Sequence, residues 1–170
     1  MLAKLKACFA GRVEAEHLRR GKLGERAAKK YLQRQGMTFL TANFRSERGE
    51  IDLILRSEDC TGSAASWKNS ILPKRLKMQW LKFMRNGAAC LVFVEVKTRS
   101  SEEWVRPAAA VNKERRQRLT RAALDYLRLL KNPPVKVRFD IVEVLLQDGA
   151  VREVRHLPNT FAMERPYRYG

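Results

Sequence analysis

Histidine and cysteine are scarce in this chain, which excludes several kinds of site. Two histidines, His17 and His156, are too few for a His-rich metal centre or for most catalytic triads. The three cysteines form no CxxC pair, so the sequence predicts neither a disulfide framework nor a zinc site. A chain of this kind suits a reducing cytoplasm.

Long apolar runs are also absent. No run approaches the roughly 18 residues that a membrane-spanning helix needs. Lys4 and Lys6 interrupt the first ten residues, so no signal peptide is expected. The sequence therefore predicts a soluble protein without a membrane partner.

Acidic residues are outnumbered almost two to one. Thirty-five Lys and Arg oppose 18 Asp and Glu, which gives a net charge of +17 and a sequence pI of about 10.4. Such an excess attracts polyanions through counterion release. Nucleic acid is the first candidate partner and an acidic membrane surface the second. The alternative is a basic component of an RNA–protein assembly that does no chemistry.

The 170 residues suit a single domain with a hydrophobic core. Residues 1–20 are expected to form a basic N-terminal extension and residues 21–165 the folded domain. Residues 57–90 interrupt that domain as a polar stretch followed by a basic amphipathic segment at 73–85, and we interpret them as a flexible insertion. Basic and aromatic residues interleave there, which suits a polyanion and base stacking. A disordered or partner-docking loop, or a membrane-surface helix, is the alternative.

Hydrophobic periodicity predicts two helices, at 22–35 and 112–131. Residues 12–20 either extend the first helix or form a separate basic one. Apolar runs predict five strands, at 39–43, 51–55, 91–97, 137–146 and 151–157. Asp148-Gly149 predicts a hairpin turn between the last two strands. This order of elements predicts an α/β fold with a mixed central sheet.

Charged residues interrupt two of the predicted apolar strands. Side chains alternate along a strand, so Glu95 and Lys97 share one face, roughly 6.7 Å apart. Asp52 is expected to share a face with Ile54, with Ile51 on the opposite face. If the two strands pair as a hairpin, Asp52 lies beside Glu95. Because buried charge is costly unless it is paired or binds a metal, these residues are candidates for chemistry.

The same residues suit phosphodiester hydrolysis. Two adjacent carboxylates, Asp52 and Glu95, are typical ligands of Mg²⁺, for which Mn²⁺ can substitute, and such an ion polarises a phosphate and activates water. The Lys97 ammonium would orient that water or stabilise the developing charge. Glu25, beside the apolar face of helix 22–35, is a candidate third acid. The alternatives are a structural ion-pair network for the strand residues and a solvated helix acid for Glu25.

Basic side chains crowd the N-terminal half of helix 112–131, where Asn112 is the expected N-cap. The helix dipole would help them to contact phosphate. A solvated helix face is the alternative. The candidate phosphate contacts on this helix include Lys113, Arg115 and Arg116.

Several motifs together resemble one family. They are Gly24-Glu25, the run Gly49-Glu50-Ile51-Asp52-Leu53-Ile54, the run from Leu91 to Arg99, and Arg138-Phe139-Asp140. In this order they resemble the YraN family of small bacterial proteins, which are predicted endonucleases of the PD-(D/E)XK superfamily and similar to Holliday-junction resolvases. The resemblance runs from about Gly21 to Phe161, without the insertion. It implies a restriction-endonuclease-like domain with a mixed central sheet flanked by helices.

The resemblance also implies roles for single residues. Asp52 and Glu95 would bind the catalytic metal with the backbone carbonyl of Val96, and Lys97 would be the catalytic lysine. Glu25 matches the helical acid that often completes such sites. Glu50 would assist Asp52 from the same strand face. Two further residues are placed to contact substrate phosphates, Arg99 and Lys113.

The function expected on these grounds is a metal-dependent endonuclease that hydrolyses DNA, including branched or structured DNA. A non-catalytic nucleic-acid-binding protein with a nuclease-like fold and an RNA-directed nuclease are the alternatives. Resolvase-like enzymes commonly act as dimers, so a homodimer is an expectation of the resemblance. The expected location is the cytoplasm, in association with the nucleoid.

Overall fold

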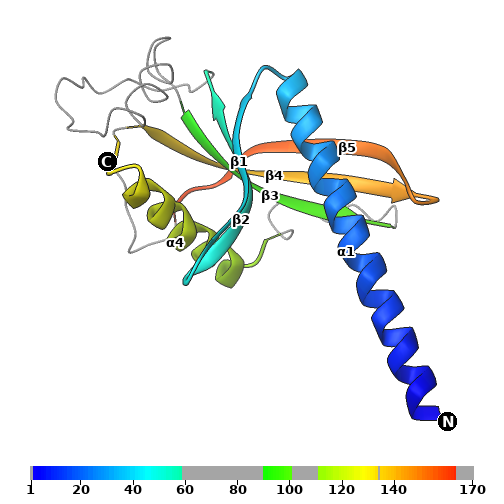
Figure 1. Ribbon diagram of the computed structural model, residues 1–170. Coiled ribbons are helices and arrows are strands. Elements are labelled where there is room, and N and C mark those ends of the chain that lie inside the picture. The colour runs from blue at the N-terminus through cyan, green and yellow to red at the C-terminus, as the bar shows by residue number, and fades with distance from the viewer. Residues whose placement is uncertain (1, 59–89, 101–110, 134, 164–170) are drawn as a thin grey trace.

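The computed structural model describes residues 2–58, 90–100, 111–133 and 135–163, with side chains from residue 16 onward. These residues form two helices and five strands (Figure 1). In chain order they are α1 (Leu2–Arg34), β1 (Thr38–Ser46), β2 (Gly49–Ser57), β3 (Cys90–Arg99), α4 (Lys113–Leu129), β4 (Lys136–Gln147) and β5 (Ala150–Phe161). Most of the insertion at 57–90, with the amphipathic segment 73–85, lies outside the described residues.

The five strands form one mixed sheet in the order β1-β2-β3-β4-β5. Neighbouring strands are antiparallel except for β3 and β4, which are parallel and are connected through α4. A parallel pair needs such a crossover connection, whereas β1–β2 and β4–β5 are joined by short turns. The α/β fold and the mixed sheet predicted from the sequence are confirmed.

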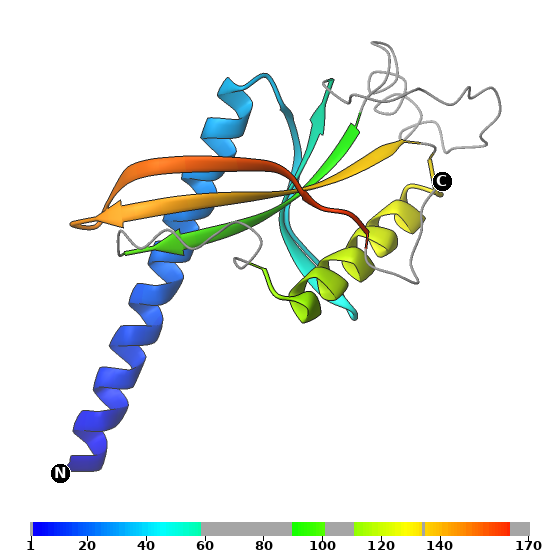
Figure 2. The ribbon, with the colours of Figure 1, turned by 180° about the vertical axis from the view of Figure 1, so that it is seen from behind.

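Each helix covers one face of the sheet. Leu119, Ala122 and Leu127 of α4 pack in a core with residues of β2, β3 and β4. Ala28 and Leu32 of α1 pack on the alternate residues of the same strands. Accordingly, α1 passes in front of the strands in Figure 1 and behind them when the molecule is seen from the back (Figure 2).

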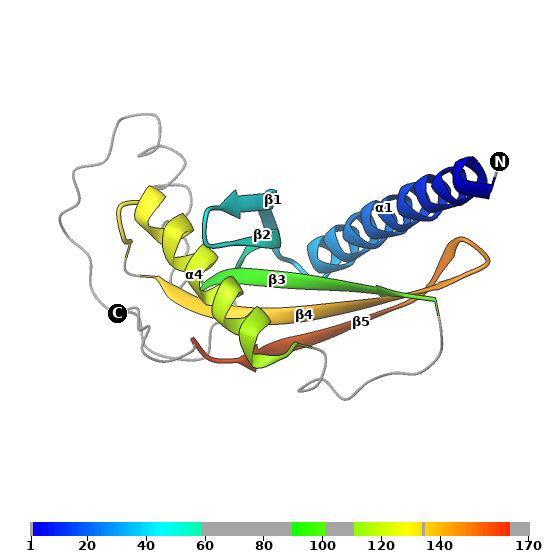
Figure 3. The same cartoon turned by 90° about the horizontal axis from the view of Figure 1, so that it is seen from below.

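The first helix is longer than the predicted segment 22–35. It runs without a break from Leu2 to Arg34, so residues 12–20 extend it rather than forming a separate helix. Gly36 follows with φ +86°, a left-handed conformation that glycine adopts without strain and that ends the helix. The N-terminal part of α1 projects beyond the sheet (Figure 3).

The predicted ends of the other elements differ by a few residues from those observed. Asn112 caps α4, and its side chain accepts a hydrogen bond from the Arg115 N–H at 2.9 Å. The turn at Asp148-Gly149 has φ values of +51° and +76°, as a tight hairpin of this handedness requires. Cys90 is disulfide-bonded, which the sequence did not predict because a single bridge leaves no spacing pattern.

No helix in the part of the chain that the structure describes has the length and apolar character to cross a membrane.

Candidate active site

The candidate site lies where β2 and β3 separate. Their ladder runs from Ser57↔Cys90 to Leu53↔Val94, and the next residues are Asp52 and Glu95. Instead of a further backbone pair, the Val96 N–H donates to Oδ2 of Asp52 at 2.7 Å. The antiparallel pairing on which the expected meeting of Asp52 and Glu95 depended is present, and a carboxylate occupies the gap at its end.

The side-chain alternation of β2 breaks at Asp52. Ile51 and Ile54 both pack in the core beneath α4, whereas Leu53 packs in the core beneath α1. The expectation that Ile51 and Ile54 lie on opposite faces is wrong. Asn43 of β1, between the partners of Leu53 and Ile51, has φ +52°, so regular strand geometry is also interrupted on β1 at this level.

Glu95 is the most buried acid of the site. Its side chain is 2% exposed, and Lys97 Nζ donates to Oε1 at 2.7 Å. Arg115 from α4 binds the same carboxylate through two bonds, from Nε to Oε1 at 3.0 Å and from Nη2 to Oε2 at 2.9 Å. A fork-shaped guanidinium matches a carboxylate in this way, and two cations compensate the buried charge.

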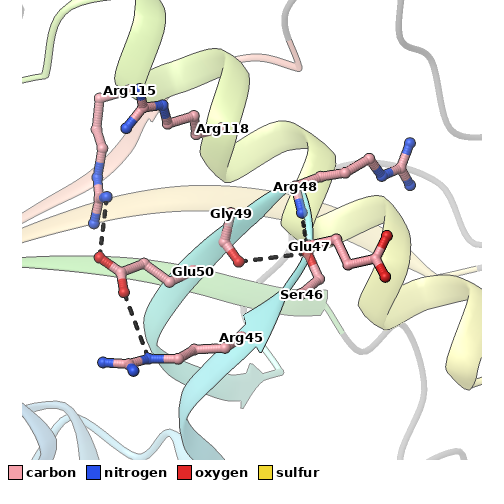
Figure 4. Close-up of a pocket in the computed structure, with 8 residues that line it drawn as sticks. All are labelled: Arg45, Ser46, Glu47, Arg48, Gly49, Glu50, Arg115 and Arg118. Atoms are coloured by element: carbon pink, nitrogen blue, oxygen red, sulfur yellow. Dashed lines mark hydrogen bonds and ion pairs between the residues drawn. The ribbon is translucent and has the colours of Figure 1, made fainter.

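Arg115 also connects Glu95 to the surface. Its Nη1 donates to Oε1 of Glu50 at 3.3 Å, and Oε2 of Glu50 lies 3.6 Å from Nε of Arg45 (Figure 4). The carboxylate of Glu50, which was expected to assist Asp52, is thus held by two arginines.

Burial and acidic neighbours shift the titration of Asp52. Burial first, and the charge of Glu95 second, raise the pKa of Asp52 from 3.8 to about 7. The Val96 N–H and Arg115 act in the opposite direction, and Glu25 adds to the increase. Two carboxylates crowded in this way favour a proton or a cation between them.

Glu25 reaches the margin of this cluster from α1. A Cβ atom on the neighbouring Gly24 would lie 1.9 Å from Oγ1 of Thr98, so glycine allows α1 to approach β3 closely. Oε2 of Glu25 accepts a hydrogen bond from Nδ2 of Asn43 at 3.0 Å. Within the described residues, no three acidic, histidine or cysteine side chains converge closely enough to hold a metal by themselves.

The other predicted phosphate contacts lie in different surroundings. Lys113 is exposed at the first turn of α4, and Arg116 is half-buried in the same turn. Arg99 faces an acid of β4, with its Nε 3.9 Å from Oε1 of Glu143. The structure thus brings Asp52, Glu95, Lys97 and Arg115 together and leaves the remaining predicted residues around them.

Glu143 was missed by the sequence reasoning. It is the register partner of Lys97 across the parallel pair and is 1% exposed. Neither of its carboxylate oxygens has a hydrogen-bond partner in the structure as described. An acid in the apolar run 137–146 was the signal that could have identified it, because Glu95 stands out in the run 91–97 in the same way.

Another buried acid of β4, Asp140, belongs to a different cluster. Asp140 of β4 accepts two bonds from Arg138, both at 2.9 Å, and one from the N–H of Asn159 at 2.9 Å. Nε2 of His156 lies 2.8 Å from Oδ2 of the same carboxylate. These contacts join β4 to β5 at the irregularity between Phe139 and Ile141.

Two pockets lie near the site, and Arg45 lines both. The first lies between the β1–β2 turn and α4, and its lining residues are Arg45, Ser46, Glu47, Arg48, Gly49, Glu50, Arg115 and Arg118 (Figure 4). The second lies between β1 and α1, and its lining includes Lys22, Glu25 and Asn43. Four arginines line the first pocket, as expected of a surface that receives an anion.

The sequence is similar to bacterial proteins of one family. A UPF0102 protein of Trichlorobacter lovleyi is 33% identical over 141 residues, which cover 83% of this chain and 88% of the relative. A UPF0102 protein of Solibacter usitatus is 37% identical over 129 residues, 75% of each chain. One from Coxiella burnetii is 32% identical over 143 residues, 82% of this chain and 89% of the relative.

The model of uncharacterised protein family UPF0102 matches residues 24–144, which include α1 from Gly24 to most of β4. This segment contains Asp52, Glu95, Lys97 and Arg115. The chain therefore belongs to UPF0102, the YraN family indicated by its sequence motifs.

Proposed function

We propose that this protein is a metal-dependent endonuclease that hydrolyses phosphodiester bonds in DNA. The observation that carries the proposal is the meeting of Asp52, Glu95 and Lys97 at the end of the β2–β3 ladder. Buried acids and a lysine at such a point are costly for stability, and chemistry gives a reason for them.

The donor set fits a hard divalent cation such as Mg²⁺ or Mn²⁺. Asp52 uses Oδ2 for the Val96 N–H, which leaves Oδ1 for a metal. The N–H and C=O of one strand residue point to the same side, so the Val96 carbonyl faces the same gap. Asp52, Glu95 and the Val96 carbonyl would hold the ion, and Glu25 would support it from the margin of the site.

Each residue has a defined task in this proposal. Asp52 and Glu95 hold the ion, which when bound polarises the phosphate and lowers the pKa of its water. Lys97, released from Glu95, orients the attacking water and stabilises charge on the phosphate. Arg99 and Lys113 contact neighbouring phosphates. Branched DNA as substrate rests on the family resemblance, and the cytoplasmic nucleoid would be the place of action.

The test is a cleavage assay on linear, nicked, flapped and four-way-junction DNA and on RNA, with Mg²⁺, Mn²⁺ or chelator. Lys97→Ala is the test variant, and Glu114→Gln, an exposed acid that pairs with Arg118 on α4, is the matched control. We expect metal-dependent cleavage that Lys97→Ala abolishes and Glu114→Gln retains. Binding without cleavage on every substrate would instead identify a non-catalytic nucleic-acid-binding protein, and cleavage of RNA alone an RNA-directed nuclease.

A homodimer would place two such sites on one substrate, as cleavage of two strands at a junction requires. Light scattering of the protein alone and on a junction tests this part of the proposal. A monomer in both samples would contradict it.

A further inference from the structure

Arg115 occupies the carboxylate that the proposed metal needs. Its guanidinium donates to both oxygens of Glu95, and Lys97 donates to one of them as well. A divalent ion on Glu95 would stand within a few ångströms of this guanidinium in a buried setting. Repulsion between like charges is strong at such distances, so Arg115 and the ion exclude each other from Glu95.

Figure 4 draws the pocket that Arg115 lines, and this pocket offers its guanidinium an alternative place. The arginine lines the pocket at the β1–β2 turn together with Arg45, Arg48 and Arg118, and its Nη1 already bonds Glu50 at that pocket's wall. Arg48 is held by Asp125, whereas Arg45 is 78% exposed and Arg118 56% exposed. A guanidinium that leaves Glu95 would join cations suited to a phosphate.

We propose that Arg115 couples metal binding to nucleic-acid binding. In the free protein it neutralises Glu95 and weakens metal binding. A phosphate in the pocket draws Arg115 away from Glu95, and the ion then binds more tightly. This inference rests on the proposed function, but it concerns the linkage between two ligands rather than cleavage itself.

The coupling must be reciprocal. If nucleic acid raises metal affinity by some factor, the metal raises nucleic-acid affinity by the same factor. Couplings of this kind lie at about 5- to 150-fold in proteins. For Arg115→Gln we expect tighter metal binding in the free protein, weaker nucleic-acid binding, and a coupling factor near one.

The experiment measures binding, not turnover. Ca²⁺, an oxygen-binding ion, serves as the probe and is titrated calorimetrically into the full chain. The affinity of a fluorescein-labelled four-way junction and of a linear duplex is measured by anisotropy with Ca²⁺ or with chelator. Arg118→Gln is the matched control, because Arg118 lines the same pocket and pairs with Glu114 instead of Glu95. It should weaken nucleic-acid binding without changing Ca²⁺ affinity or the coupling.

Arg115→Lys guards against a folding defect in Arg115→Gln, and circular dichroism checks both variants. Lysine keeps one charge but loses the bidentate fork, so its coupling should lie between those of wild type and Arg115→Gln. Unchanged Ca²⁺ affinity and coupling in both variants would overturn the inference while leaving the nuclease proposal intact. If no divalent ion binds wild type or variants, both the inference and the proposed function fail.

Discussion

Two acids on strands of the same sheet, Asp140 on β4 and Asp52 on β2, differ in how the fold treats their charge. Asp140 is surrounded by donors from Arg138, His156 and the Asn159 backbone, so the fold itself satisfies its charge. Asp52 has one backbone donor and faces another carboxylate, and its pKa is raised to about 7. A carboxylate whose hydrogen bonds and charge are satisfied by the protein has a structural role, whereas a carboxylate with few partners indicates a place for a ligand.

The largest effect on cleavage is expected from a substitution at Asp52. Asp52→Asn removes a carboxylate that we propose as a metal ligand, and we expect cleavage to fall by about a hundredfold to a thousandfold, the range for loss of a key electrostatic group. Folding should be preserved, because the amide can still accept the Val96 N–H and no longer repels Glu95. Single-turnover cleavage and thermal melts measure the two quantities. An active Asp52→Asn protein would contradict the assignment.

A substitution at Asp140 is expected to lower stability and to leave cleavage intact. Asp140→Ala leaves Arg138 buried without its carboxylate, and breaking such a pair costs about 3–5 kcal/mol of unfolding free energy. Urea denaturation measures the loss. At low temperature, where Asp140→Ala is expected to remain folded, it should retain the proposed cleavage and metal binding. A small loss of stability would show that the Asp140 cluster does not secure β5 on β4.

Gly24→Ala should have a smaller effect on both cleavage and stability. The added Cβ would clash with Oγ1 of Thr98, and overpacking of this kind costs about 1–3 kcal/mol. Because α1 would move away from β3, Glu25 would also retreat from Asp52. Gly21→Ala is the matched control, since no atom lies within 4 Å of a Cβ at that position. Equal stabilities of the two variants would contradict the close approach of helix and strand.

The remaining prediction is a pH dependence of stability in chelator. The folded protein holds a proton on Asp52 up to about pH 7, whereas the unfolded chain releases it near 3.8. Between these values the folded state binds more protons, so Asp52 lowers stability as the pH rises from about 4 to about 7. Asp52→Asn should lack this decline. Melting temperatures of both proteins across this range, without metal, provide the measurement, and parallel curves would contradict the raised pKa.

The features of the fold that depend on local sequence pattern were predictable from the sequence. The runs containing Asp52 and Glu95 predicted two strands, and their antiparallel pairing, on which the expected meeting of the two acids was conditional, is present in the structure. The contact of Arg115 with Glu95 was not predictable, because helical spacing does not say which turn of α4 faces β3. The left-handed backbone conformation of Asn43 was not predictable either, because strand propensity does not indicate where a single residue departs from strand geometry.

The pairing of Ser57 with Cys90 has a practical consequence. The chain leaves the sheet at Ser57 and returns at its register partner Cys90, so the two ends of the intervening segment lie side by side. With the Cys90 disulfide reduced, a cut within this segment would leave two pieces that can reassemble through the β2–β3 ladder. One piece would contain Asp52 and the other Glu95, Lys97 and Arg115. Co-expressed halves would thus form a reporter in which restored metal binding records reassembly of the sheet.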